Sequence, residues 1–116
     1  MSDMINPVEL TSELIRCESI TPKSDGSIDL IISYLEPLGF TCTKIDFGEG
    51  NEKVENLYAK FGNLEPNICF GGHVDVVPTG DIENWSINPF GGDIKEGKIW
   101  GMALAFVVND SGLALW

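Results

Sequence analysis

One histidine and one aspartate, two residues apart, are the side chains with the clearest capacity for chemistry. His73 is the only histidine among the 116 residues, and it stands directly after an apolar run and two glycines. Asp75 lies two residues further along the chain. In an extended strand, residues two apart point to the same face, so we expect the imidazole and the carboxylate to project together. A carboxylate that accepts one ring N–H fixes the tautomer and leaves the other nitrogen to bind a metal or a proton.

The same pair also has a structural interpretation. A partly buried histidine is often satisfied by a neighbouring carboxylate without any role in chemistry. The His-x-Asp spacing taken alone favours this interpretation. The residues on either side of the pair shift the balance toward a functional site.

The spacing of apolar residues predicts the helices and strands that must position the His73–Asp75 pair. Helical spacing of apolar residues and strand-like alternation divide the chain into short segments. The predicted elements, in order, are helices at about 7–15 and 27–38, strands at 40–47, 55–61 and 67–72, and a short strand or hairpin arm at 94–100. We predict one α/β layer, with the two helices packed on a mixed β-sheet. The continuously apolar strand 67–72 is expected inside that sheet, with His73 at its carboxyl end.

Several short motifs stand around His73 and before it. They are Gly-His-Val-Asp-Val-Val-Pro-Thr-Gly at 72–80, Trp85, Asn-Pro-Phe at 88–90, the segment 93–101, Asn-Leu-Tyr-Ala at 56–59 and Ser-Ile-Thr-Pro at 19–22. Together these motifs resemble the di-zinc aminoacylase and peptidase superfamily. Within it, the chain is most similar to the succinyl-diaminopimelate desuccinylase family, from about Val8 to Gly101. In these relatives the turn that matches Ser19-Ile20-Thr21-Pro22 lies close to the active site.

The resemblance implies the catalytic domain of a zinc-dependent exopeptidase-like fold that hydrolyses N-acyl amides. N-succinyl-diaminopimelate would give succinate and diaminopimelate, in lysine and cell-wall precursor synthesis. His73 would ligate one of two zinc ions, with cobalt as an alternative metal, and Asp75 would be the catalytic-site carboxylate that holds this ligand. The metal would keep one position open for water. The implied partner is a small N-acyl amino acid, and the full-length relatives are homodimers.

The resemblance ends after Gly101. Relatives continue with an aspartate that bridges the two metal ions, whereas this chain has Phe106, which cannot bind a metal. Asp110 lies four residues later and is not assigned as a ligand. The family's general base, its remaining ligands and its dimerisation domain have no counterpart here. We therefore divide the chain into 1–101, the N-terminal part of a metallohydrolase catalytic domain, and 102–116, a divergent apolar tail.

Two origins remain open for the tail. A changed reading frame or gene end is favoured over a remodelled protein in which the tail is packed. On the favoured origin, the chain is a desuccinylase-like fragment that is inactive alone. The alternatives are a non-catalytic α/β remnant with a binding or regulatory role, and a related zinc deacylase or carboxypeptidase with another substrate.

Composition limits the partners and the compartment. The formal net charge is −11, which argues against binding to nucleic acid or to anionic lipid. Three cysteines are widely spaced and form no Cys-x-x-Cys motif, so reduced thiols are expected. The start of the chain has no basic and apolar leader, and the longest apolar run is too short to cross a bilayer. The sequence thus predicts a cytoplasmic protein with no nucleic-acid or membrane partner.

Overall fold

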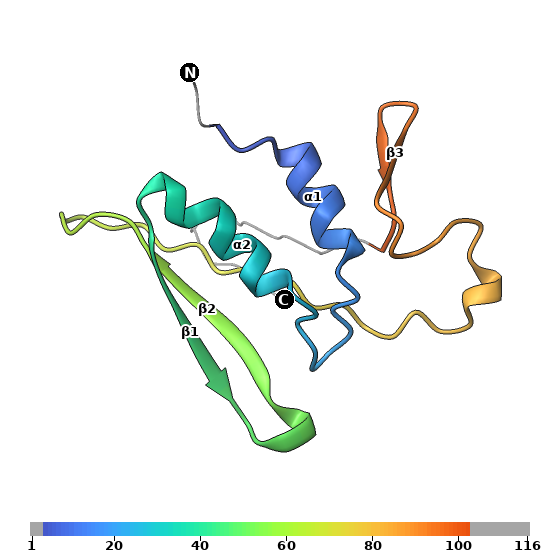
Figure 1. The fold of residues 1–116 in the computed structure, drawn as a ribbon, viewed down its shortest axis with the longest axis horizontal. Helices are drawn as coiled ribbons and strands as arrows, with labels where there is room; N and C mark the ends of the chain where they lie inside the picture. The colour runs from blue at the N-terminus through green and yellow to red at the C-terminus, as the bar shows by residue number, and fades with distance from the viewer. Residues whose placement is uncertain (1–3, 103–116) are drawn as a thin grey trace.

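The computed structural model describes residues 4–102 and shows two helices and two separate β-hairpins in this part of the chain (Figure 1). The helices are α1 (Pro7–Arg16) and α2 (Ser27–Leu35). The hairpins are formed by β1 (Thr41–Phe47) with β2 (Val54–Lys60), and by β3 (Asp93–Lys95) with β4 (Lys98–Trp100). Three short 3₁₀ turns are Glu36–Leu38, Gly50–Glu52 and Ile82–Asn84. Neither α1 nor α2 is long and apolar enough to cross a membrane.

Helix α1 begins where the sequence predicts it. The Asn6 side-chain oxygen accepts from the backbone N–H groups of Val8 at 3.0 Å and Glu9 at 3.4 Å, so it satisfies donors that have no partner within the helix. Pro7 occupies the first turn, where its missing N–H costs nothing. The buried face of α1 carries Ser12 and Ile15.

Helix α2 ends earlier than the predicted residue 38 and continues as a 3₁₀ turn, Glu36–Leu38. Pro37 explains the change, because its ring clashes with the preceding helical turn and it has no N–H to donate. Gly39 then adopts a φ of 93°, and its N–H donates to the Glu36 carbonyl at 2.9 Å. This left-handed residue stops the helical segment directly after the predicted end at 38.

The strands predicted at 40–47 and 55–61 are confirmed, and they pair as a hairpin. β1 and β2 are antiparallel, with Thr41 opposite Lys60 and Phe47 opposite Val54. Helix α2 lies along this hairpin (Figure 1), and Lys44 of β1 forms an ion pair with Asp29 of α2.

Helix α1 contacts the β3–β4 hairpin, which lies beside it in Figure 1, and the two form a corner of the structure. The buried Ser12 hydroxyl donates to the Gly92 carbonyl at 2.5 Å. Gly92 has a φ of 62°, and a Cβ there would lie 2.5 Å from the Ser12 carbonyl oxygen. Only glycine fits this approach. The backbone N–H of Met102 donates to the Pro89 carbonyl at 2.6 Å and closes the corner.

The predicted mixed sheet is wrong for residues 4–102. Both ladders there are antiparallel and lie in separate two-stranded sheets. Parallel pairing is limited, within the same residues, to an isolated bridge between Ile20 and Val76. The α/β class is confirmed at the level of two helices with small sheets.

The predicted interior strand at 67–72 is also wrong. These residues form no strand, and no backbone hydrogen bond joins them to another described residue. Ile68 is 81% exposed and Phe70 is 72% exposed. A strand needs a neighbour to accept and donate its backbone hydrogen bonds, and none of the segments from 4 to 102 lies in position to do so. The predicted tail assignment, with Phe106 and Asp110, falls on residues 103–116, outside the described part.

Candidate functional site

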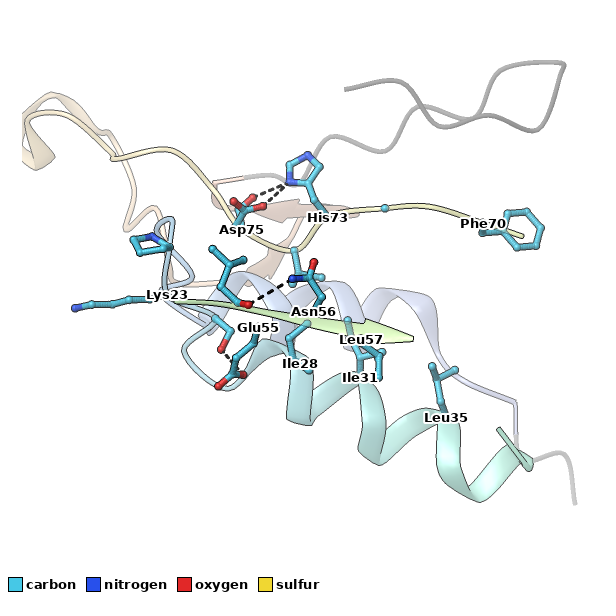
Figure 2. A pocket seen from close by; sticks show the side chains of 15 residues that line it. Lys23, Ile28, Ile31, Leu35, Glu55, Asn56, Leu57, Phe70, His73 and Asp75 are labelled. Carbon is cyan, nitrogen blue, oxygen red and sulfur yellow. Dashed lines mark hydrogen bonds and ion pairs between the residues drawn. The ribbon is translucent and has the colours of Figure 1, made fainter. Parts of the chain in front are cut away.

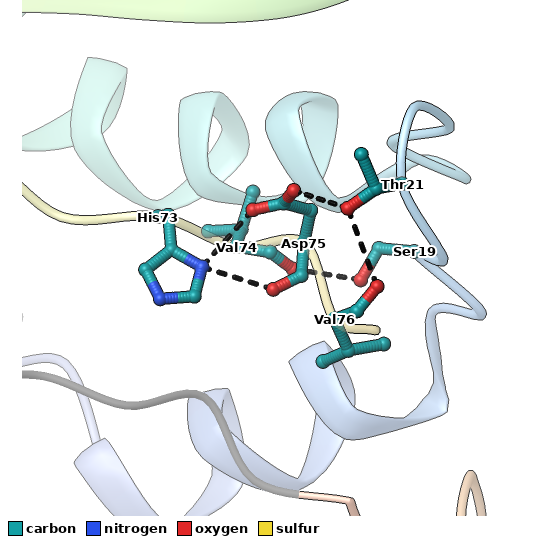
Figure 3. A network of polar contacts seen from close by, with 6 residues as sticks. All are labelled: Ser19, Thr21, His73, Val74, Asp75 and Val76. Carbon is teal, nitrogen blue, oxygen red and sulfur yellow. Dashed lines mark hydrogen bonds and ion pairs between the residues drawn. The ribbon is translucent and has the colours of Figure 1, made fainter. Parts of the chain in front are cut away.

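The two predicted site residues are in contact. His73 Nδ1 lies 3.0 Å from Asp75 Oδ1 and 3.0 Å from the Asp75 backbone oxygen (Figure 3). A carbonyl and an ionised carboxylate can only accept hydrogen bonds, so Nδ1 must carry the proton. In the neutral imidazole the lone pair then lies on Nε2, the nitrogen through which such a histidine binds a metal or takes up a proton.

A distant turn, and not a strand, holds this pair in place. The backbone N–H of Val76 donates to the Ser19 carbonyl at 2.9 Å, and the N–H of Thr21 donates to the Val76 carbonyl at 3.0 Å. The Ser19 hydroxyl, in a residue only 1% exposed, donates to the Val74 carbonyl at 2.7 Å. The segment around Asp75 is therefore fixed by the turn that the sequence places before α2.

The two oxygens of Asp75 have separate partners. Oδ1 accepts from His73, and Oδ2 accepts from the Thr21 hydroxyl at 2.5 Å (Figure 3). Burial raises the pKa of Asp75, but the hydrogen bonds from Thr21 and His73 outweigh it, and the pKa lies below its ordinary value. Asp75 is therefore an anion at neutral pH, as an acceptor from Nδ1–H must be.

A groove of about 520 Å³ runs from this pair along α2 and β2. Figure 2 shows His73 and Asp75 across the groove from α2, whose side chains Ile28, Ile31 and Leu35 face it. The walls are largely apolar, as in most small-molecule sites. Two charged side chains beyond the His–Asp pair also line it, namely Lys23 and Glu55.

The described residues fit a metal centre in part. Zinc sites use imidazole ligands whose second ring nitrogen donates to a carboxylate, which is the arrangement of His73 and Asp75. However, no three His, Cys, Asp or Glu side chains gather into a ligand cluster anywhere between residues 4 and 102. One imidazole with an orienting carboxylate is present among residues 4–102, and a full ligand set is not found among them.

Residue patterns alone did not identify Ser19 or Thr21 as neighbours of the pair. Ser19 lies 55 residues from Val74 and Thr21 lies 54 residues from Asp75, and no periodicity connects segments so far apart. The one signal was the resemblance of the Ser-Ile-Thr-Pro turn to a family motif near an active site. That signal located the turn without indicating its contacts.

Curated relatives of the chain share one name, succinyl-diaminopimelate desuccinylase. The protein of that name from Rhodospirillum centenum is 50% identical over 101 residues, covering 86% of this chain and 26% of the relative. Its counterpart from Ehrlichia canis is 48% identical over 97 residues, covering 84% and 26%, and that from Caulobacter vibrioides is 48% identical over 101 residues, covering 87% and 25%. No protein-family model matches the chain.

The alignments cover most of this chain, which spans about a quarter of the length of the curated relatives it matches. At this identity the motif resemblance noted around His73 extends over the compared length as a whole. The chain thus resembles the N-terminal part of the succinyl-diaminopimelate desuccinylases.

Proposed function

We propose that His73 and Asp75 belong to the active site of a metal-dependent amide hydrolase that acts on N-succinyl-diaminopimelate. The contact of His73 Nδ1 with Asp75 Oδ1 at 3.0 Å is the observation that carries the proposal. Relatives 45–50% identical to the chain bear the name of this activity. The partner is then a small N-acyl amino acid in the cytoplasm, and the metal is zinc or cobalt.

In the proposed reaction water adds its oxygen to the amide carbonyl carbon, the C–N bond breaks, and succinate and the free amine are released. A bound zinc ion would supply polarisation of that carbonyl and a lowered pKa of the water. His73 would contribute the lone pair of Nε2. Asp75 would keep the proton on Nδ1 and stabilise the ring orientation as an anion. The general base is assigned to none of the residues from 4 to 102.

The chain on its own is proposed to have no appreciable desuccinylase activity and to bind zinc weakly. One imidazole cannot replace the three or four ligands that zinc requires. Residues 1–101 are proposed to be a partial catalytic domain of the exopeptidase-like fold, followed by a divergent tail at 102–116. Calorimetry that detects tight binding of two zinc ions to the purified chain would contradict this.

A chimera tests whether the site is functional. Residues 8–101 of this chain would replace the matching segment of the Rhodospirillum centenum desuccinylase, and hydrolysis of N-succinyl-diaminopimelate would be measured. We expect an active chimera in which His73→Ala lowers kcat/KM by at least about 100-fold and Asp75→Asn lowers it by about 10- to 100-fold.

The matched control is Thr11→Val, because the Thr11 hydroxyl is exposed and donates to the Pro7 carbonyl within α1. This variant is expected to keep the activity of the chimera. A folded chimera that is active with His73→Ala would overturn the proposal. A binding role would then be favoured, since the exposed apolar side chains of Ile68 and Phe70 offer a surface for contact.

A further inference from the structure

We propose that Thr21 is a positioning residue for His73, acting through Asp75. The turn at 19–22 would thereby strengthen the carboxylate contact that keeps the proton on Nδ1, beside the contact of the same nitrogen with the Asp75 backbone oxygen at 3.0 Å. The importance of this for catalysis rests on the proposed function above. The tautomer itself does not, because it can be observed without metal or turnover.

The Asp75 carboxylate accepts hydrogen bonds from two donors, one at each oxygen. An aspartate can rotate about its Cβ–Cγ bond and offer either oxygen to a neighbour. Here Oδ2 accepts from the Thr21 hydroxyl at 2.5 Å, which leaves Oδ1 directed to His73 Nδ1 at 3.0 Å. Without the Thr21 hydroxyl, the carboxylate would lose its hydrogen bond from the turn at 19–22 and would be less restricted in this rotation.

Thr21 is itself held in place by backbone hydrogen bonds. Its backbone N–H donates to the Val76 carbonyl at 3.0 Å, and Val76 N–H donates back to the Ser19 carbonyl at 2.9 Å. The following Pro22 restricts the backbone of Thr21 to extended conformations. The hydroxyl is thus placed by the backbone and does not merely follow the carboxylate.

In the hydrogen bond between Thr21 and Asp75, the Thr21 hydroxyl is the donor. The Thr21 oxygen lies 2.5 Å from Asp75 Oδ2 and 3.3 Å from the Val76 carbonyl, and both of these are acceptors. The single hydroxyl hydrogen must therefore point toward them, and it serves the nearer carboxylate. A hydroxyl donated to Oδ2 leaves Oδ1 directed to the imidazole N–H, which Oδ1 shares with the Asp75 backbone oxygen.

Because the chain has a single histidine, the imidazole can be observed directly. We would label the full chain with ¹⁵N-histidine and record the two ring-nitrogen signals at a pH of about 8, where an ordinary imidazole is neutral. The wild type is expected to show one protonated nitrogen, Nδ1, and one lone-pair nitrogen, Nε2. In Thr21→Val both signals should shift part of the way toward the mixed-tautomer values of free histidine, because the Asp75 backbone oxygen still accepts from Nδ1 while the carboxylate is less well oriented.

Two variants separate positioning from simple stability. Thr21→Ser keeps the hydroxyl and is expected to restore the wild-type signals. Thr11→Val removes an exposed hydroxyl that donates within α1, and it should leave them unchanged. Wild-type signals in a folded Thr21→Val, or a Thr21→Ser spectrum equal to that of Thr21→Val, would overturn the proposal.

The wild-type spectrum decides the matter even if Thr21→Val does not fold. A proton on Nε2 in the wild type would contradict the assigned contacts and overturn the proposal at once. This readout needs neither metal nor turnover. An inactive chimera would therefore count against the proposed function and leave the tautomer result standing, and the reverse also holds.

Discussion

Two consecutive segments of this chain, 67–72 and 73–76, differ sharply in how they are held. Residues 67–72 are rich in apolar side chains, yet they are exposed and make no backbone hydrogen bond to another described residue. Residues 73–76 are more polar and only partly exposed, and hydrogen bonds to Ser19 and Thr21 tie them to the turn before α2. The His73–Asp75 pair is thus held by hydrogen bonds from the turn at 19–22. The preceding apolar run at 67–72 makes no backbone hydrogen bond to another described residue that would help to hold it.

The largest expected effect comes from removing a backbone donor at the anchored segment. Val76→Pro deletes the N–H that donates to the Ser19 carbonyl, and we expect it to lower the free energy of unfolding by about 2 kcal/mol. Ile68→Pro is the matched change in the unpaired segment and should stay within about 0.5 kcal/mol of wild type. Urea unfolding measures both. Equal losses in the two variants would mean that the segments do not differ in support.

Ser19→Ala sharpens the same comparison at one side chain. It leaves the Val74 carbonyl without the hydroxyl donor that lies 2.7 Å away in a buried position. The expected cost is about 1.5 kcal/mol in urea unfolding. Ser33→Ala serves as the control, because its hydroxyl is exposed and donates only to the Leu30 carbonyl within α2. A Ser19→Ala variant as stable as Ser33→Ala would contradict the anchoring role.

The unanchored segment should reveal itself by association instead of unfolding. Exposed apolar side chains of this size favour contact between copies of a chain. We expect Phe70→Ser to weaken self-association by about 1 kcal/mol, or roughly fivefold, with no loss of unfolding free energy. Sedimentation velocity over a concentration series measures the change. Unaltered association with reduced stability would show that Phe70 is a core residue after all.

The smallest expected effect is a pH dependence carried by Asp75. Its folded-state pKa is lowered, so its contribution to stability is full above the ordinary aspartate pKa of about 3.9 and is lost as the pH falls through the folded value. The urea midpoint of Asp75→Asn should therefore fall less than that of wild type between about pH 5 and pH 2. If the urea midpoints of the two proteins fall equally with pH, the hydrogen bonds of Asp75 are not the cause of the pH dependence.

Several elements were predictable because their causes are local. Asn6 and Pro7 begin α1, and Gly39 stops the helical segment, through contacts within a few residues. The β1–β2 and β3–β4 hairpins follow from alternation around short turns. The interior strand at 67–72 was predicted from apolar composition, which states that a segment suits a buried position. It does not state that a pairing strand is present, and none of the segments from 4 to 102 supplies one.

The sequence by itself determined the His73–Asp75 contact, because two residues of spacing bring both side chains to one side of an extended backbone. It also carried the resemblance to the desuccinylases, which the comparisons confirm. Only the tertiary structure decided that Ser19 and Thr21 complete this site. Their partners lie 55 and 54 residues away, respectively, and such contacts depend on how the chain closes its loops and on no property of either segment alone.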